Sequence, residues 1–302
     1  MANGTLLFLL IAFTIIDLFE VFFFWATGYV LPTEASILLR VLVDIPILFI
    51  AFSSARPAPA LKLHIPKVNN MVYSIALAFF LYLVLAISIR MLSTAFVSAG
   101  VSTSSGNATA EVMNEQPFMI AFLFYCVLAP VTEEVLFRGM LQNAYERRFG
   151  WGAFVIAGVL FGLIHGNVLA IVNGIAAGIM LGYLYIKTKS LWCPIVFHGL
   201  FNLFAFTLVP DYYIINLPWV LGLFPADTLS YANPVYLCYN LGILAIGVLM
   251  CYVLVRLLNR ANLGHVARRS SAYLPERGQG IVFLAAVILL GLRVGMNIAA
   301  SL

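Results

Sequence analysis

Two adjacent glutamates and an arginine stand inside an otherwise apolar stretch of the chain, residues 129–141 (APVTEEVLFRGML). Successive residues of a helix are turned by about 100°, so Glu134 and Arg138 lie on one face and can pair in the favourable acid-before-base order. Glu133 points about 100° away from that pair. An acidic side chain in the middle of a membrane span costs about 2.5–3.5 kcal/mol. We therefore expect Glu133 to face a water-filled cavity, a partner on another helix, or both.

Three more polar residues stand in apolar stretches and could complete a reactive site. His165 lies in FGLIHG and His198 in PIVFHGLFN, and Asn202 follows His198 by one helical turn on the same face. A carboxylate at position 133 could take a proton from water and deliver it to a leaving amine. His165, which titrates near neutrality, could position that water or share the proton. His198 and Asn202 could donate hydrogen bonds to a developing oxyanion.

These residue types are suited to the hydrolysis of a peptide or similar acyl bond by activated water. A covalent nucleophile is disfavoured because no serine or cysteine stands in a comparable polar setting. A structural interpretation competes with the chemical one. Glu134 and Arg138 are readily explained as an ion pair that fixes helix packing, and a single buried histidine is usually a packing residue. Two histidines together with a second, unpartnered glutamate favour chemistry.

Three motif blocks also resemble a known set. They are Glu133-Glu134-x-x-x-Arg138, Phe161-x-x-x-His165 and His198-x-x-x-Asn202, which lie in the sequence segments TEEVLFRG, FGLIHG and FHGLFN. They are similar to the motifs of the CAAX protease and bacteriocin-processing family (CPBP, also called Abi), in its prokaryotic branch. The similarity extends to the order of the motifs along the chain, to the spacing within each motif and to the surrounding sequence. The resemblance covers about residues 117–206.

The resemblance implies both a fold and an activity. The fold is an all-helical bundle that encloses a polar cavity, and the activity is that of a glutamate-dependent intramembrane endopeptidase. On the matching positions of this chain, Glu133 is the base, with His165 as its partner on the water. His198 and Asn202 form the oxyanion site, and the neighbouring acid–arginine pair orients the pocket.

A zinc site is the open alternative within this interpretation. One carboxylate and two imidazoles could form a three-ligand zinc site with an open position. The HExxH spacing is missing, however, and the amide of Asn202 is a poor fourth ligand. If Glu133 were a ligand, the base would have to be Glu134, which Arg138 is expected to occupy. We therefore expect no metal and no other cofactor.

The composition places these residues in a membrane. Hydrophobic residues make up 63% of the 302-residue chain and charged residues 9%, against about 25% charged in soluble domains. Apolar runs of about 20 residues without strand-like alternation predict helices. We expect an all-α, polytopic membrane bundle in a single domain, residues 1–302, whose residues 117–206 form the motif-bearing core. Nine spans are predicted, with eight as the alternative, at roughly 5–27, 35–54, 70–92, 117–138, 151–167, 168–187, 190–209, 235–256 and 281–299.

Basic residues occur in every second loop of this span map. The loops near 28–34, 93–116 and 210–234 contain no lysine or arginine. By the positive-inside rule, this alternation predicts a cytoplasmic N-terminus and an external C-terminus. With the family resemblance, it suggests a bacterial plasma membrane. The net charge of +4 requires no nucleic-acid partner. The basic loops carry Arg56, Lys62 and Lys67; Arg147 and Arg148; Lys187 and Lys189; and Arg256, Arg260, Arg268, Arg269 and Arg277.

Proline and glycine positions predict how the helices around the site are shaped. Pro130 removes a helix hydrogen bond one turn before the acids, which predicts a local break. Two stripes of glycines at four-residue spacing predict helices packed backbone to backbone. The stripes consist of Gly158, Gly162 and Gly166, and of Gly174, Gly178 and Gly182.

The candidate site residues are predicted to lie at different depths in the membrane. At 1.5 Å per residue from the cytoplasmic ends of their spans, Glu133 and His198 lie about 8–15 Å deep, but His165 lies about 20 Å deep. We therefore expect the helix before His165 to begin outside the lipid or to tilt, or the bilayer to be thin locally. The depths favour a cavity that opens to the cytoplasmic side.

Charges in other spans are interpreted as structural. Arg40 and Asp44 stand one turn apart in the second span, where they can pair with each other. Asp17 and Glu20 in the first span could meet arginines of neighbouring helices or line a path for substrate. None of these four residues is placed in the active site.

The leading functional prediction is an intramembrane endopeptidase that acts on a membrane-associated peptide or protein. The family suggests a leader peptide, a lipidated C-terminus or a bacteriocin-type precursor as substrate. The alternative is a non-catalytic membrane scaffold, with an immunity or regulatory role, that uses the same polar pocket to bind a partner. A transporter would use similar buried charges, but the inverted repeats expected of one are not visible.

Overall fold

The structure is a computed structural model that describes residues 2–29, 32–53, 61–100, 117–165, 168–208 and 216–263, together with 285, 286, 288 and 289. All of its regular elements in this part of the chain are helical. They are α1 (Ala2–Thr27), α2 (Thr33–Phe52), α4 (Val68–Ser98), α6 (Phe118–Ala121), η1 (Phe122–Leu128), α7 (Ala129–Glu134), η2 (Val135–Gln142), α8 (Asn143–Phe149), α9 (Gly152–Leu163), α10 (Val168–Thr188), α11 (Trp192–Leu208), α12 (Leu217–Val220), η3 (Ala226–Thr228) and α13 (Pro234–Ala261).

The expected all-α, polytopic membrane fold is confirmed. Among the described residues, six helical stretches are long and apolar enough to cross a membrane, and α9 and α11 are shorter apolar helices. The first eight predicted spans each coincide with one of these. The ninth, at 281–299, lies outside the described residues except for four positions.

The residues that carry the acids belong to one long helix that is not purely α-helical. It runs from Phe118 to Phe149 through α6, η1, α7, η2 and α8, and it ends at Gly150, whose φ of 56° suits a glycine. The segments η1 and η2 on either side of the acids are π-helical. The predicted break at Pro130 is therefore replaced by a continuous helix with wider turns, a distortion that often occurs at functional sites.

The helices α9 and α10 pack backbone to backbone, as the glycine stripes predict. A Cβ atom built on Gly178 would lie 2.7 Å from the carbonyl oxygen of Gly158, and one on Gly158 would lie 2.6 Å from the amide nitrogen of Ile179. No side chain larger than hydrogen fits at either position without separating the helices. Gly166 lies outside the described residues.

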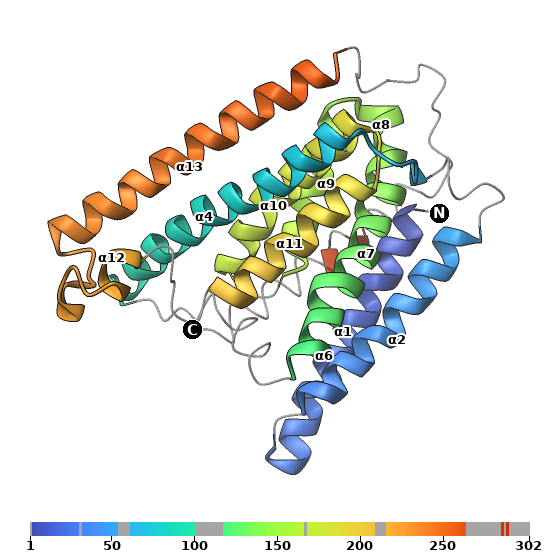
Figure 1. Ribbon diagram of the computed structural model, residues 1–302. Helices are drawn as coiled ribbons and strands as arrows, with labels where there is room; N and C mark the ends of the chain where they lie inside the picture. The colour runs from blue at the N-terminus through green and yellow to red at the C-terminus, as the bar shows by residue number, and fades with distance from the viewer. Residues whose placement is uncertain are drawn as a thin grey trace.

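On one side of the bundle, α13 lies along α4 (Figure 1). Asn70 at the start of α4 and Asn262 after α13 exchange two hydrogen bonds, of 3.2 and 2.7 Å, in a buried setting. The hydroxyl of Tyr183 on α10 donates to Asn259 Oδ1 at 2.7 Å. These polar contacts tie α13 to the bundle, although much of its apolar surface is exposed.

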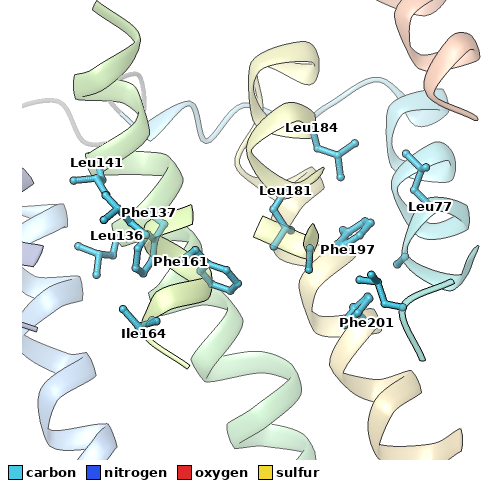
Figure 2. Close-up of a cluster of buried hydrophobic side chains, with 14 of the residues drawn as sticks. Leu77, Leu136, Phe137, Leu141, Phe161, Ile164, Leu181, Leu184, Phe197 and Phe201 are labelled. Carbon is cyan, nitrogen blue, oxygen red and sulfur yellow. The ribbon is translucent and has the colours of Figure 1, made fainter. Parts of the chain in front are cut away.

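The hydrophobic core lies where the long helix, α9, α10, α11 and α4 meet. In Figure 2, Leu136, Phe137 and Phe161 gather on one side, and Leu77, Leu181, Phe197 and Phe201 lie on the other. The long helix thus occupies the centre of the fold. It contacts α1 and α2 through η2 and α7, and α11 through η1 and α7 (Figure 1).

Candidate active site

Glu134 is a fully buried hydrogen-bond partner of an arginine and a histidine. Its Oε1 atom accepts from Arg138 Nη1 at 2.9 Å, and Nδ1 of His198 lies 3.0 Å from the same oxygen. The side chains of Glu134 and Arg138 are both 0% exposed. Spacing along one helix predicted the arginine contact. The histidine contact comes from α11 and depends on how two helices pack, so spacing within one helix could not reveal it.

Arg138 fixes the long helix against the α9–α10 pair. Its Nη2 atom donates to the carbonyl oxygen of Gly178 at 2.9 Å. Its guanidinium carbon lies 4.5 Å from the ring centre of Phe161, within the range of a cation–π interaction. The arginine therefore joins three helices at the base of the site.

Glu133 occupies a different environment from its neighbour. Its Oε2 atom lies 3.8 Å from Nε2 of His198, which is too long for a direct hydrogen bond. Its side chain is 27% exposed, whereas that of Glu134 is completely buried. The expected division is thus present in the geometry: Glu134 is enclosed by its partners, and Glu133 faces a histidine of another helix with part of its surface accessible.

His165 lies in the turn that follows α9. The helix predicted over 151–167 ends at Leu163. Two hydrogen bonds from His165 to the carbonyl groups of the last turn close the helix there. Its amide donates to Gly162 O at 3.0 Å, and its Nδ1 lies 2.9 Å from Phe161 O. A carbonyl oxygen can only accept, so Nδ1 carries the hydrogen and Nε2 presents a lone pair.

Phe161 forms the common wall of the site. Its ring centre lies 5.0 Å from that of His165 and 5.5 Å from that of His198. It also meets Phe137 edge to face at 5.3 Å. This aromatic therefore packs against the histidine of its own motif, and the same ring contacts the second histidine and Arg138.

Asn202 is anchored to a backbone carbonyl that Pro130 leaves without a helical partner. Ala129 N–H donates to Phe124 O, five residues back. The next amide in this pattern would donate to the carbonyl of Tyr125, but Pro130 has no N–H. Asn202 Nδ2 donates to that carbonyl instead, at 2.8 Å. One of the two amide hydrogens of Asn202 is therefore used structurally, and the other is left for a different acceptor.

The long helix and α11 also approach each other closely next to Asn202. The carbonyl oxygen of Cys126 faces Gly199 on α11. A Cβ atom on Gly199 would lie 2.5 Å from that oxygen, so only glycine allows the approach. The glycine that follows His198 in the motif thus has a packing role.

One acidic residue near the site was assigned elsewhere from the sequence. Asp44 on α2 is 6% exposed, and α2 packs against α7, which carries Glu133. Its proximity to Arg40 was expected from their spacing. The packing of α2 against α7 depends on the relative placement of two helices, for which the sequence offers only the presence of a second intramembrane acid.

The described part of the chain offers no ready metal site. Within it, no group of three His, Cys, Asp or Glu side chains is arranged to hold a metal ion. Metal independence itself remains a prediction.

Comparisons with known proteins match the same part of the chain that carries the site. Residues 115–204 match the family described as "Type II CAAX prenyl endopeptidase Rce1-like". A Bacillus subtilis (strain 168) protein, YdiL, named as a candidate membrane peptidase, is 31% identical over 109 residues. That match covers 35% of this chain and 44% of the relative. No solved structure matches the chain.

Proposed function

Residues 115–204 belong to the CAAX protease and bacteriocin-processing family, and on that premise we propose that this membrane protein is an intramembrane endopeptidase. Its substrate would be a membrane-associated peptide or protein. Glu133 would activate the water that hydrolyses the peptide bond.

The observation that carries the proposal is the pairing of Glu133 with His198. A partly accessible carboxylate lies 3.8 Å from an imidazole nitrogen, and a fully buried carboxylate holds the other nitrogen of that ring at 3.0 Å. An ion pair that serves only packing would bring both carboxylates into full hydrogen bonding. Here one acid orients the histidine, and the other retains accessible surface beside it.

The reaction begins with a water molecule between Glu133 and the free Nε2 of His165. Glu133 takes a proton from this water, whose oxygen forms a bond to the carbonyl carbon of the substrate. The electron pair of the carbonyl double bond moves to its oxygen. When this tetrahedral species collapses, the carbon–nitrogen bond breaks and the proton on Glu133 passes to the leaving nitrogen. Glu133 is again a carboxylate, and the atoms and charges balance.

His198 and Asn202 would stabilise the oxyanion in this scheme. Glu134 can only accept a hydrogen bond when ionised, so Nδ1 of His198 donates to it, and a protonated ring presents Nε2–H to the pocket. Asn202 retains one amide hydrogen for the same purpose.

The location of the site follows from the same proposal. The basic loops would put the N-terminus in the cytoplasm and the mouth of the cavity on the cytoplasmic side, in a bacterial plasma membrane. The substrate would then enter from the bilayer or from its inner surface.

A single conservative substitution tests this proposal. In Glu133→Gln the amide cannot accept the proton of water, so we expect hydrolysis to fall by about 10²–10⁴-fold without loss of folding. Peptides of membranes that carry wild type or Glu133→Gln are compared by mass spectrometry, with Glu20→Gln on α1 as the matched control. A peptide that only wild type and the control process identifies the substrate.

Two further outcomes have definite meanings. Full biological activity of Glu133→Gln would overturn the peptidase proposal in favour of a scaffold that binds a partner. Activity that persists in a strong chelator supports hydrolysis without metal, whereas activity lost to the chelator and restored by Zn²⁺ would replace that part of the mechanism.

A further inference from the structure

Gln142 is a buried polar residue of the long helix that the proposed mechanism does not use. It lies four residues after Arg138 and, like Arg138 and Glu134, it is 0% exposed. Its Nε2 atom donates to the carbonyl oxygen of Gly182 on α10 at 2.8 Å. Its Oε1 atom is buried and has no hydrogen-bond partner among the described residues. Burying an amide with one unsatisfied atom costs stability, so packing alone does not explain a glutamine at this position.

Arg138 and Gln142 bind α10 in the same register. Arg138 Nη2 donates to the carbonyl oxygen of Gly178 at 2.9 Å, and Gln142 donates to the carbonyl four residues further along both helices. Each donor thus meets the residue 40 positions after it. A Cβ atom on Gly182 would lie 2.6 Å from Gln142 Oε1, so the glycine makes room for the amide between the two helices.

The second hydrogen bond fixes what the first one leaves free. A single contact lets two helices pivot about it, whereas two contacts four residues apart define both their register and their relative rotation. A buried polar side chain that selects one helix register in this way is known from coiled coils. The bond of Gln142 therefore restrains the position of the whole helix segment that carries the motif acids.

A row of short hydrogen bonds leads from this contact to the site. Arg138 Nη1 donates to Glu134 Oε1 at 2.9 Å. The same oxygen lies 3.0 Å from Nδ1 of His198 on α11. A long helix that shifted or rotated against α10 would move the carboxylate that orients this imidazole.

We propose that Gln142 is a positioning residue for His198. By holding the long helix in register with α10, it keeps Glu134 where that carboxylate orients the ring of His198. Gln142 acts through these two residues and takes no part in the reaction itself. The effect on catalysis rests on the proposed function, whereas the effect on the histidine ring does not.

Asn240 on α13 provides a matched control for the loss of a buried amide. It is also 0% exposed, and its Nδ2 atom donates to a backbone carbonyl, that of Tyr236, at 2.9 Å. Its Oδ1 atom is likewise buried without a hydrogen-bond partner in the described part of the chain. The bond of Asn240 lies within one helix, however, and that of Gln142 joins two. Only Gln142→Met should therefore loosen the contact between the long helix and α10, and Asn240→Leu should not.

The first test observes the ring of His198 without any substrate. The full-length protein is prepared with isotope-labelled histidine in detergent micelles, and the Nδ1–H signals of its buried imidazoles are recorded by NMR. Loss of a signal in His198→Gln identifies that of His198. Gln142→Met keeps the length of the side chain but cannot donate, so we expect the His198 signal to move or broaden. The His165 signal should stay in place, because its hydrogen bond closes within its own turn.

The second test is the split between kcat and KM. The substrate is the peptide whose processing distinguishes wild type from Glu133→Gln. A displacement of about 1 Å can slow a reaction about 10²-fold, so we expect kcat per folded molecule of Gln142→Met to fall about 10–10²-fold. KM should stay within about twofold of wild type, as expected when an interaction of the transition state is lost. Asn240→Leu should melt at a lower temperature but keep both the NMR signals and kcat.

The outcomes separate this inference from the proposed function. An unchanged His198 signal in folded Gln142→Met overturns the positioning role, whatever the activity. A changed signal with the kcat of wild type supports the positioning role and contradicts a catalytic role of His198. If Glu133→Gln cleaves normally, the peptidase proposal fails and the NMR test still decides the role of Gln142. Should Gln142→Met not fold, Gln142→Asn decides: its shorter amide cannot span the same distance to α10, so a His198 signal like that of wild type contradicts the proposal.

Discussion

A single oxygen atom of Glu134 holds the centre of the site together. Arg138 approaches it along the helix and His198 approaches it from α11, and both contacts are short and fully buried. Hydrogen bonds between ionised groups in such a setting are stronger than neutral ones. The second glutamate of the motif thus holds Arg138 and His198 in place, although its own carboxylate is not accessible.

At the residue scale we expect Glu134→Gln to destabilise the protein more than Glu133→Gln. The substitution leaves Arg138 as a buried charge without its carboxylate, a change that typically costs about 3–5 kcal/mol. Glu133 is partly accessible, so neutralising it leaves no fully buried charge without a partner. The measurement is thermal unfolding of both purified variants in the same detergent.

A compensated variant controls for this interpretation. In Glu134→Leu with Arg138→Met, both charges leave together, and much of the lost stability should return. His198 loses its anchor in that variant, so activity should stay low. Equal melting temperatures for Glu134→Gln and Glu133→Gln would contradict the view that only the former holds a buried cation.

At the scale of elements, Pro130 and Asn202 act as a pair across two helices. The proline removes one backbone donor, and the asparagine supplies a side-chain donor to the carbonyl of Tyr125. The wider turns of η1 let this exchange occur without breaking the helix. The motif asparagine is therefore held in place by a feature of the sequence that lies 72 positions before it.

This pairing predicts a non-additive effect on stability. Asn202→Ala should cost about 1–3 kcal/mol, because the carbonyl of Tyr125 loses its donor. In a Pro130→Ala background the new amide at position 130 can donate to that carbonyl, so the same substitution should cost about 1 kcal/mol less. Thermal unfolding of the four members of this double-mutant cycle measures the difference.

An unrelated asparagine provides the control for the cycle. Asn240→Ala removes a side-chain donor to the carbonyl of Tyr236 on α13, and its cost should be the same in the wild-type and Pro130→Ala backgrounds. Additive effects of Pro130→Ala and Asn202→Ala would show that the proline does not create the need for Asn202. Activity is a separate readout: the double variant should regain stability but remain about 10²–10³-fold slower if Asn202 also serves the oxyanion.

At the scale of the whole molecule, the sequence predicts local geometry well and cross-helix geometry poorly. Composition and apolar run length were sufficient for the all-α membrane fold, because a bilayer permits few other solutions. Four-residue spacing was sufficient for the Glu134–Arg138 pair and for the α9–α10 packing. The contact of His198 with Glu134 was not predictable, since it depends on the relative rotation of two helices that are distant in sequence.

Two features of the helices differ from the sequence-based prediction. The helix before His165 ends earlier than expected, and the helix that contains Pro130 does not break. His165 bonds to the carbonyl of Phe161 and leaves the helix, which a count of apolar residues could not indicate. Pro130 was expected to break its helix, but π-helical turns absorb the missing hydrogen bond. In both places a side-chain or backbone hydrogen bond replaces the regular pattern, and both lie at the candidate active site.

A second ionic cluster, formed by Glu146, Lys62 and Lys189, joins the end of the long helix to the segment before α4 and to the corner between α10 and α11. Glu146, at the end of the long helix, accepts from Lys62 at 3.0 Å and from Lys189 at 3.2 Å. Lys62 precedes α4, and Lys189 lies in the corner between α10 and α11. Burial lowers the pKa of Lys62, and the charge of Glu146 opposes this effect. One carboxylate thus connects three separate parts of the chain.

We expect Glu146→Gln to lower the stability of the bundle and to affect chemistry much less. Two partly buried ammonium groups would then repel each other without a carboxylate between them. The loss should be about 1–3 kcal/mol, between the values for exposed and buried pairs, because the lysine side chains are 18% and 27% exposed. Thermal unfolding at low and high salt measures it, and high salt should reduce the difference from wild type.

The variant Glu146→Gln with Lys189→Gln removes the repulsion and should recover part of the stability. A Glu146→Gln protein that melts like wild type at low salt would contradict this view. Backbone hydrogen bonds of the segment before α4, such as that from Leu191 N–H to Lys62 O at 3.0 Å, would then hold these ends together without the charges.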